Sequence, residues 1–200
     1  MEKHLILYRS TNSKGKRDAT GAFIPEAIAL SKILGRSDDV EVLRFPRSFT
    51  KVPRINLSGN FESISVFCHG WVNGVELLPS GRSGASQMAR YMKEHSCKYL
   101  NLFACSAANE GHSGGCYARW VSEECHNLGH RAQVFGHETA GHTSWNPKAR
   151  FYWSTSRGVE TERAVDPMRD GWDEWRAFRK RMKNDQEYCL MLPFMYDEFE

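Results

Sequence analysis

The sequence has no long apolar run, no internal repeat and no low-complexity tract. Near the N-terminus, the apolar run Leu5, Ile6 and Leu7 is followed almost at once by charged residues. Such a run is too short for the core of a signal peptide or for a membrane span. We therefore expect a cytoplasmic protein that makes no contact with a membrane.

Charge of one sign is also scarce. The formal net charge is +3 over 200 residues, and basic residues gather only in the stretch 176–183. A nucleic-acid-binding domain usually carries a strongly basic stripe, so we expect no nucleic-acid partner. The glycine motifs G-x-G-x-x-G and G-x-x-x-x-G-K-[ST] are absent. Because these motifs hold nucleotide phosphates, we expect no bound nucleotide. We expect no other cofactor either.

The six cysteines include no C-x-x-C pair, and several lie in apolar periodic segments. We expect free thiols in a reducing compartment rather than disulfides. A metal site could be sought at His130, His137, Glu138 and His142. The spacing of these residues fits no helical H-E-x-x-H arrangement, Gly141 would break a helix, and no cysteine pair accompanies them, so we predict no metal.

A chain of this length can bury one sizeable core, and we expect a single domain. Apolar runs alternate with helical periodicity, which predicts an α/β three-layer sandwich with a mostly parallel central sheet. Strands are expected at residues 4–9, 40–45, 64–68, 99–104, 132–135 and 151–156. Helices are expected at residues 23–34, 83–96, 118–128 and 172–182, the last with a stripe of Trp172, Trp175, Phe178 and Met182 read as core packing.

Two of the predicted strands end at residues that can carry chemistry. Strand 64–68 ends at His69 and Gly70, and strand 99–104 ends at Cys105. In a parallel sheet the carboxyl ends of the strands share one edge, where the loops diverge and leave a crevice. Neighbouring strands lie about 5 Å apart, so imidazole and thiol would face a common substrate. We interpret Cys105 as a nucleophile and His69 as its acid and base. The N–H groups of Gly70 and Cys105 would form an oxyanion hole.

The two segments, ISVFCHG at residues 64–70 and LNLFAC at residues 100–105, resemble the caspase-like (clan CD) cysteine peptidases. The resemblance is to bacterial or phage proteins rather than to caspases proper, because the signature Q-A-C-[RQG]-G is absent. It implies a caspase-hemoglobinase fold, a Cys/His dyad and cleavage of peptide bonds after a selected residue. It also implies an enzyme that processes itself or acts on host or partner proteins, in the cytoplasm or delivered as an effector.

The resemblance covers about residues 1–160, and residues 161–200 are expected to form a helical extension packed on the same domain. That extension is where we would look for an activator or partner. The loops 111–115 and 136–150 are expected to shape the substrate cleft, with Ser106, His137, His142 and Trp145 among its residues. His142 could also assist or replace His69. In the second loop, Lys148 and Arg150 would favour an acidic substrate residue, whereas Glu138 would favour a basic one.

Two other functions remain open from the sequence. The segment GHSGG at residues 111–115 fits the G-x-S-x-G elbow of a serine esterase, with Ser113 as nucleophile and residues 69–71 as oxyanion loop. The polar residues 106–110 argue against it, because an elbow follows directly on a buried strand. The other alternative is a caspase-like binding module without activity, in which Cys105 is a structural thiol. Replacing Cys105 should abolish the activity of a cysteine peptidase, and replacing Ser113 that of a serine esterase. A binding module should tolerate both changes.

Overall fold

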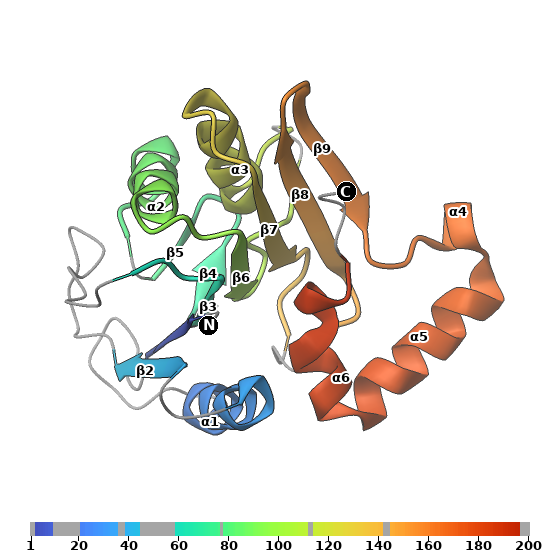
Figure 1. The fold of residues 1–200 in the computed structure, drawn as a ribbon. Helices are drawn as coiled ribbons and strands as arrows, with labels where there is room; N and C mark the ends of the chain where they lie inside the picture. Colours follow the sequence, from blue (N-terminus) through green and yellow to red (C-terminus); the bar gives the residue numbers. More distant parts are fainter. Residues whose placement is uncertain are drawn as a thin grey trace.

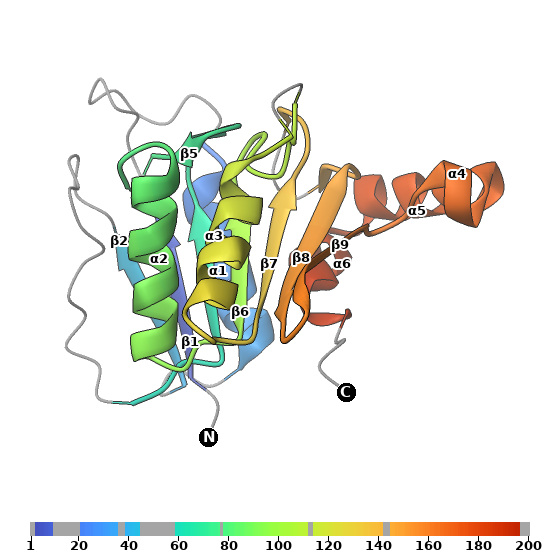
Figure 2. The same cartoon turned by 90° about the horizontal axis from the view of Figure 1, so that it is seen from above.

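The computed structural model describes residues 3–9, 21–35, 39–44, 59–76, 78–111, 114–141 and 145–196. These residues form a central sheet with helices on both faces, which confirms the predicted α/β class (Figures 1 and 2). The sheet has seven strands in the order β2-β1-β3-β6-β7-β8-β9. Strands β2, β1, β3, β6 and β7 are parallel, and β8 and β9 continue the sheet in antiparallel pairing.

The bounds of these strands agree closely with the expected ones in the first half of the chain. They are β1 His4–Tyr8, β2 Val40–Arg44, β3 Ser63–Phe67, β6 Tyr99–Phe103, β7 Ala132–His137, β8 Ala149–Thr155 and β9 Gly158–Arg163. Every residue of β3, β6 and β7 is buried. Helices therefore cover both faces of these strands, which is why they read as continuous apolar runs in the sequence.

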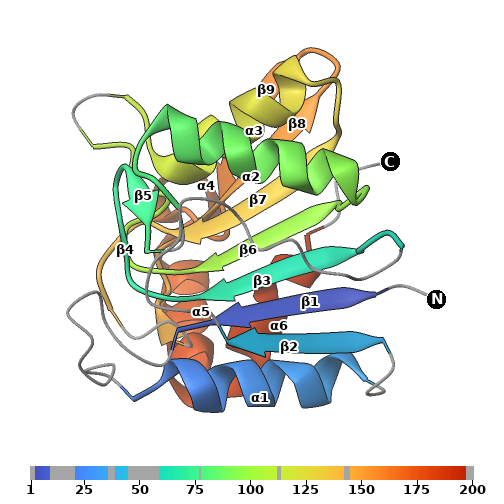
Figure 3. The same ribbon diagram turned by 90° about the vertical axis from the view of Figure 1, so that its left-hand side faces the viewer.

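The helices form two layers. On one face, α2 (Arg82–Glu94) and α3 (Tyr117–Asn127) pack on the sheet, with Met88, Met92 and Val121 in the core. On the other face lie α1 (Phe23–Leu34), α5 (Trp172–Asn184) and α6 (Gln186–Met191). Figure 3 shows the parallel strands pointing toward one edge, beside the two-stranded hairpin of β4 (Gly70–Trp71) and β5 (Gly74–Val75). That edge collects the loops that follow each strand.

Two features of the sheet differ from the expectation. The predicted loop 136–150 is shorter, since Gly136 and His137 belong to β7, and Ala149 and Arg150 belong to β8. Backbone pairing extends these strands beyond their apolar residues, because ladder hydrogen bonds do not depend on side-chain type. Strand β9 was not predicted; it is a polar edge strand that extends the sheet past residue 160.

The C-terminal stripe is only partly core. Phe178 and Met182 of α5 are buried, as predicted, whereas Trp172 is 59% exposed and Trp175 is half-buried. Three short helical segments were not predicted: α4 (Pro167–Asp170) before α5, and α6 and η2 (Leu192–Phe194) after it. In the residues that the structure describes, no helix is both long and apolar enough to cross a bilayer.

Candidate active site

His69 and Cys105 occupy matching positions on neighbouring strands. β3 and β6 pair in parallel with Phe67 opposite Phe103, and His69 and Cys105 are each the second residue beyond that pair. The rings of Phe67 and Phe103 stack with their centroids 4.6 Å apart beneath this edge. The structure therefore brings the two predicted residues to the same edge of the sheet.

Gly70 presses directly on the segment that carries Cys105. A Cβ built on Gly70 would lie 2.7 Å from the backbone oxygen of Cys105 and 2.8 Å from Cβ of Ala104. Such distances are shorter than van der Waals contact, so any larger residue would push the two strand ends apart. Besides its predicted place at an oxyanion hole, Gly70 is thus required for the close approach of the two segments.

The hairpin β4–β5 sets the direction of the Gly70 N–H. Glu76 N donates to His69 O at 2.9 Å, and the next residue pair of the ladder is Gly70 with Val75. Because hydrogen-bonded and non-hydrogen-bonded pairs alternate in an antiparallel ladder, the Gly70 N–H points away from β5. The hairpin is braced by a buried ion pair between Glu76 and Arg9, 3.4 Å apart, which ties it to the end of β1.

The imidazole of His69 lies on the α1 face of the sheet. Its ring meets the ring of Phe23 edge to face, with centroids 5.1 Å apart. The preceding residue, Cys68, is fully buried in the core on the α2 and α3 face. Cys68 and His69 therefore point to opposite faces of the sheet, as the alternation of side chains along a strand requires.

Cys105 differs from the other cysteines in its exposure. All six are free thiols, as predicted, but five are buried and only Cys105 is partly open to solvent. Burial raises the pKa of each of the five, to about 12 for Cys125 and Cys189. A thiolate is the nucleophilic form of cysteine, so the buried five are poor nucleophiles at neutral pH. The Sγ of Cys105 lies 3.4 Å from the carbonyl oxygen of Gly141.

The chain turns sharply just after Cys105. Ser106 has a φ of 56°, in the left-handed region that non-glycine residues rarely adopt. Its N–H donates to Thr139 O at 3.2 Å, and Ala108 N donates to His137 O at 3.0 Å. The turn that follows β6 is therefore tied to the end of β7 and to the loop beyond it.

One buried side chain shapes that β7–β8 loop. Asn146 is only 4% exposed. Its Oδ1 accepts hydrogen bonds from the Thr139 hydroxyl at 3.2 Å and from Lys148 N at 3.1 Å, and its Nδ2 donates to Thr139 O at 2.9 Å. Asn146 thereby fixes the loop that places Gly141 against Cys105. No pattern in the sequence pointed to this role beyond the presence of an asparagine in a loop.

An open cleft of about 760 Å³ lies between this loop, β9 and the C-terminal helices. Its lining residues are Asn109, Glu138, Thr139, Ala140, Gly141, Trp145, Asn146, Pro147, Lys148, Ala149, Arg163, Val165, Pro167, Trp172, Trp175 and Arg179. Trp145 lines the cleft and is 49% exposed. The contribution of α5 was not predicted, because no local pattern reveals which loop a helix will face.

The other predicted cleft residues are placed differently. His137 is 1% exposed and packs beside the rings of Phe103 and Phe135, with centroids 6.3 and 5.3 Å away, so it lies beneath the loop instead of on the cleft wall. Ser106 is half-buried beside Cys105 and is not among the lining residues. His142, and Ser113 of the alternative esterase elbow, lie outside the described residues.

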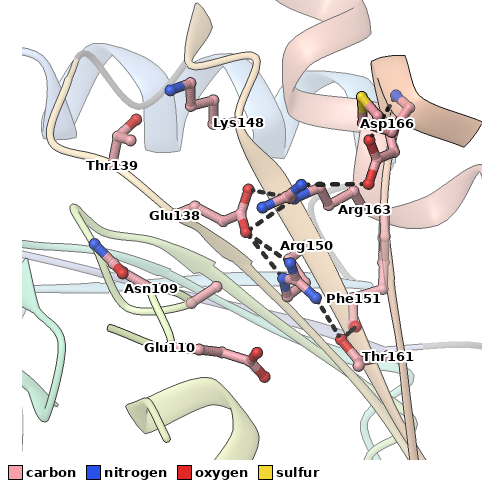
Figure 4. Close-up of polar contacts among 12 residues, drawn as sticks. Asn109, Glu110, Glu138, Thr139, Lys148, Arg150, Phe151, Thr161, Arg163 and Asp166 are labelled. Atoms are coloured by element: carbon pink, nitrogen blue, oxygen red, sulfur yellow. Dashed lines mark hydrogen bonds and ion pairs between the residues drawn. The ribbon is translucent and has the colours of Figure 1, made fainter. Parts of the chain in front are cut away.

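Figure 4 shows how the charges around Glu138 are paired. Glu138 accepts from Arg150 at 2.9 Å and from Arg163 at 3.1 Å, and Arg163 also reaches Asp166 at 3.2 Å. Glu138 is thus engaged by two guanidinium groups, and it offers little attraction to a basic ligand. Arg150 is engaged as well, which leaves Lys148 as the loop cation that faces the cleft.

A metal site of the kind considered from the sequence has no support in the structure. His130 precedes β7, with its Nε2 2.7 Å from Cys97 O, whereas His137 ends that strand. The two imidazoles therefore lie at opposite edges of the sheet. Within the described ranges, no group of three or more His, Cys, Asp or Glu side chains could hold a metal ion.

Comparison with models of known protein families finds no match to this chain, and a search of curated proteins finds no relative.

Proposed function

We propose that the protein is a caspase-like cysteine peptidase in which Cys105 is the nucleophile and His69 the acid and base. One observation carries the proposal. The only cysteine that is not buried stands at the carboxyl edge of the sheet, at the same register as His69 on the neighbouring strand. Structural thiols are usually buried, so a partly open thiol at this edge, with a histidine beside it, favours a reactive pair.

The proposed chemistry uses Cys105, His69 and the backbone N–H of Gly70. The Cys105 thiolate attacks the carbonyl carbon of a peptide bond, and the developing oxyanion accepts hydrogen bonds from the N–H groups of Gly70 and Cys105. His69 donates a proton to the leaving amine, and the acyl group stays on Sγ. Water then attacks the thioester with His69 as base, which releases the acid and regenerates the thiol.

The surroundings of the pair fit this role. The edge-to-face contact with Phe23 restricts the His69 ring, and the hairpin β4–β5 holds the Gly70 N–H away from its own ladder. We further propose a cytoplasmic, reducing site of action, because all six cysteines are free thiols. The fold does not support the serine esterase alternative. β6 ends at Phe103 and is followed by a turn, so no strand runs directly into Gly111.

The test is the reaction of the native protein with iodoacetamide across pH, located by mass spectrometry and repeated in His69→Ala. We expect selective modification of Cys105 at neutral pH, slowed about tenfold or more without His69, because the proposed base would no longer take the proton from the thiol. His130→Ala, which removes a histidine from the opposite edge, is the matched control and should leave the rate unchanged. A rate that does not depend on His69 would refute the dyad.

Substrate turnover provides the second measurement. A fluorescently quenched peptide library should be cleaved by the wild type, and Cys105→Ala should lower the rate by several orders of magnitude, as expected when a nucleophile is removed. Cleavage that persists in Cys105→Ala but disappears in Ser113→Ala would replace this proposal by the esterase-type mechanism.

A further inference from the structure

The cleft beside Cys105 is large enough to hold several residues of an extended peptide. Its volume of about 760 Å³ lies in the range of ligand sites, about 300–1,000 Å³. It begins at Gly141, whose carbonyl oxygen lies 3.4 Å from Cys105 Sγ, and extends to Trp172 and Arg179 of α5. Cys105 itself is not among the described lining residues, but a chain that occupies the Gly141 end of the cleft lies near the thiol.

The walls of the cleft are aromatic on both sides. Trp145 from the β7–β8 loop is 49% exposed, and Trp172 at the start of α5 is 59% exposed. Trp175, one turn further along α5, is half-buried and also lines the cleft. Exposed tryptophans on a folded surface are costly in water and are enriched where a partner covers them. Apolar or aromatic side chains of a ligand would complete this surface.

The charges of the lining are mostly positive. Lys148, Arg163 and Arg179 line the cleft, and among the described lining residues Glu138 is the one carboxylate. Glu138 is held by Arg150 and Arg163, so it adds little negative potential to the open space. The described part of the chain offers no carboxylate in ion-pair distance of Lys148 or Arg179, both of which are exposed. Arg179 instead lies over the ring of Trp175, 5.9 Å from its centroid.

We propose that this cleft is an extended recognition site for an acidic polypeptide segment that also carries aromatic or aliphatic side chains. Carboxylates of the segment pair with Lys148 and Arg179, and its apolar side chains pack on Trp145 and Trp172. The C-terminal helix α5 is then part of the recognition site instead of an accessory extension. That the bound segment belongs to a substrate of Cys105 rests on the proposed function; the preference for acidic, apolar polypeptide does not.

The test measures binding without catalysis. Full-length Cys105→Ala protein is titrated into a fluorescein-labelled random copolymer of glutamate and tyrosine, and binding is followed by anisotropy at physiological salt. We expect saturable binding that is weakened about tenfold by Lys148→Gln with Arg179→Gln, given the usual strength of exposed ion pairs. The matched pair Lys32→Gln with Arg90→Gln removes the same charge from α1 and α2, away from the cleft, and should change the affinity less than about twofold.

The aromatic part of the proposal has its own controls. Trp172→Ala should weaken binding of the glutamate–tyrosine copolymer and leave binding of poly-glutamate unchanged, because only the first polymer carries aromatic groups. Equal weakening by the two charge-removing pairs would show unspecific attraction and overturn the proposal, as would tighter binding of a lysine–tyrosine copolymer or no binding at all. If the copolymer binds as expected but Cys105 of the wild type does not react with iodoacetamide, the proposed peptidase is refuted and the proposed recognition site is not.

Discussion

Each end of β6 carries a cysteine with a histidine close by, and the two ends differ in what surrounds the sulfur. At the amino end, Cys97 is buried, its Sγ lies 3.3 Å from Tyr99 O, and His130 reaches its backbone carbonyl at 2.7 Å. At the carboxyl end, Cys105 is partly open and lies beside a cleft. Proximity of cysteine and histidine is therefore not enough for a site; the loops must also diverge, as they do where parallel strands end.

The two ends share a backbone feature as well. Ser96 immediately precedes Cys97 with a φ of 51°, and Ser106 immediately follows Cys105 with a φ of 56°. At the amino end this left-handed residue adjoins a buried cysteine, and at the carboxyl end it adjoins a partly exposed one. The backbone conformation alone therefore does not decide whether the neighbouring thiol is accessible.

The largest difference should appear in thiol reactivity. In the native protein we expect iodoacetamide to modify Cys105 at least about a thousandfold faster than Cys97, because a buried thiol reacts only after an opening that costs several kcal/mol. Mass spectrometry of a time course would measure both rates. In urea the two rates should converge. A native Cys97 rate within tenfold of that of Cys105 would erase the distinction between the two ends.

The close contact at Gly70 should have the next largest effect. Gly70→Ala should destabilise the fold by about 1–3 kcal/mol, as overpacking does, and slow the labelling of Cys105. Each kcal/mol corresponds to about 2–4 °C in the melting temperature, measurable by calorimetry. Adding Ala104→Gly removes the contact at 2.8 Å but not the one with Cys105 O, so stability should recover only in part.

Gly129→Ala serves as the comparison at the amino edge. Gly129 follows α3 with a φ of 65° and has open space around it, so alanine there costs stability through backbone strain alone. Labelling of Cys105 should then stay at the wild-type rate. If Gly70→Ala behaved in the same way, the proposed link between Gly70 and the thiol would be wrong.

Alkaline pH should reveal the burial of Cys97 through its effect on stability. Burial raises the pKa of the Cys97 thiol, so the folded state keeps a proton that the unfolded chain loses above about pH 8.5. The contribution of this thiol to stability is complete below that pH and is lost as pH rises, by up to about 1.4 kcal/mol per unit. Urea unfolding at pH 8, 9 and 10 should show a shallower decline in Cys97→Ala. Val121→Ala, a buried substitution without a titrating group, should keep the wild-type slope.

The smallest effects are expected at the two serines. Glycine relieves left-handed strain but adds freedom to the unfolded chain, so Ser96→Gly and Ser106→Gly should each stabilise by about 0.5–1 kcal/mol. Urea midpoints would measure this. Only Ser106→Gly should also change the labelling rate of Cys105. An equal change in both variants would mean that the rate reports global stability instead of the local turn.

The parts of the fold that the sequence predicted are those with a local signal. Buried strands 64–68 and 99–104 read as apolar runs, and their shared edge follows from parallel pairing, so His69 and Cys105 could be placed together in advance. The two-residue strands β4 and β5 are too short for any period, and the polar β9 has no apolar face to announce it.

The recognition cleft could not be predicted for a related reason. It depends on the packing of α5 beside a loop that is distant in the chain, and Trp172 has the same helical spacing whether it faces a core or solvent. The burial of His137 was missed because its side-chain type suggests a surface, whereas its position at the end of β7 places it beneath the loop.

The hydrogen bonds of Asn146 carry a consequence for how this protein could diversify. A single amide side chain links Thr139 to Lys148, and Lys148 takes part through its backbone N–H, so this link does not depend on the side chain at position 148. The side chain of Lys148 can then be exchanged with little risk to the scaffold, and a new preference can arise without a new fold. Laboratory selection of altered specificity would best randomise Lys148 while Asn146 is kept constant.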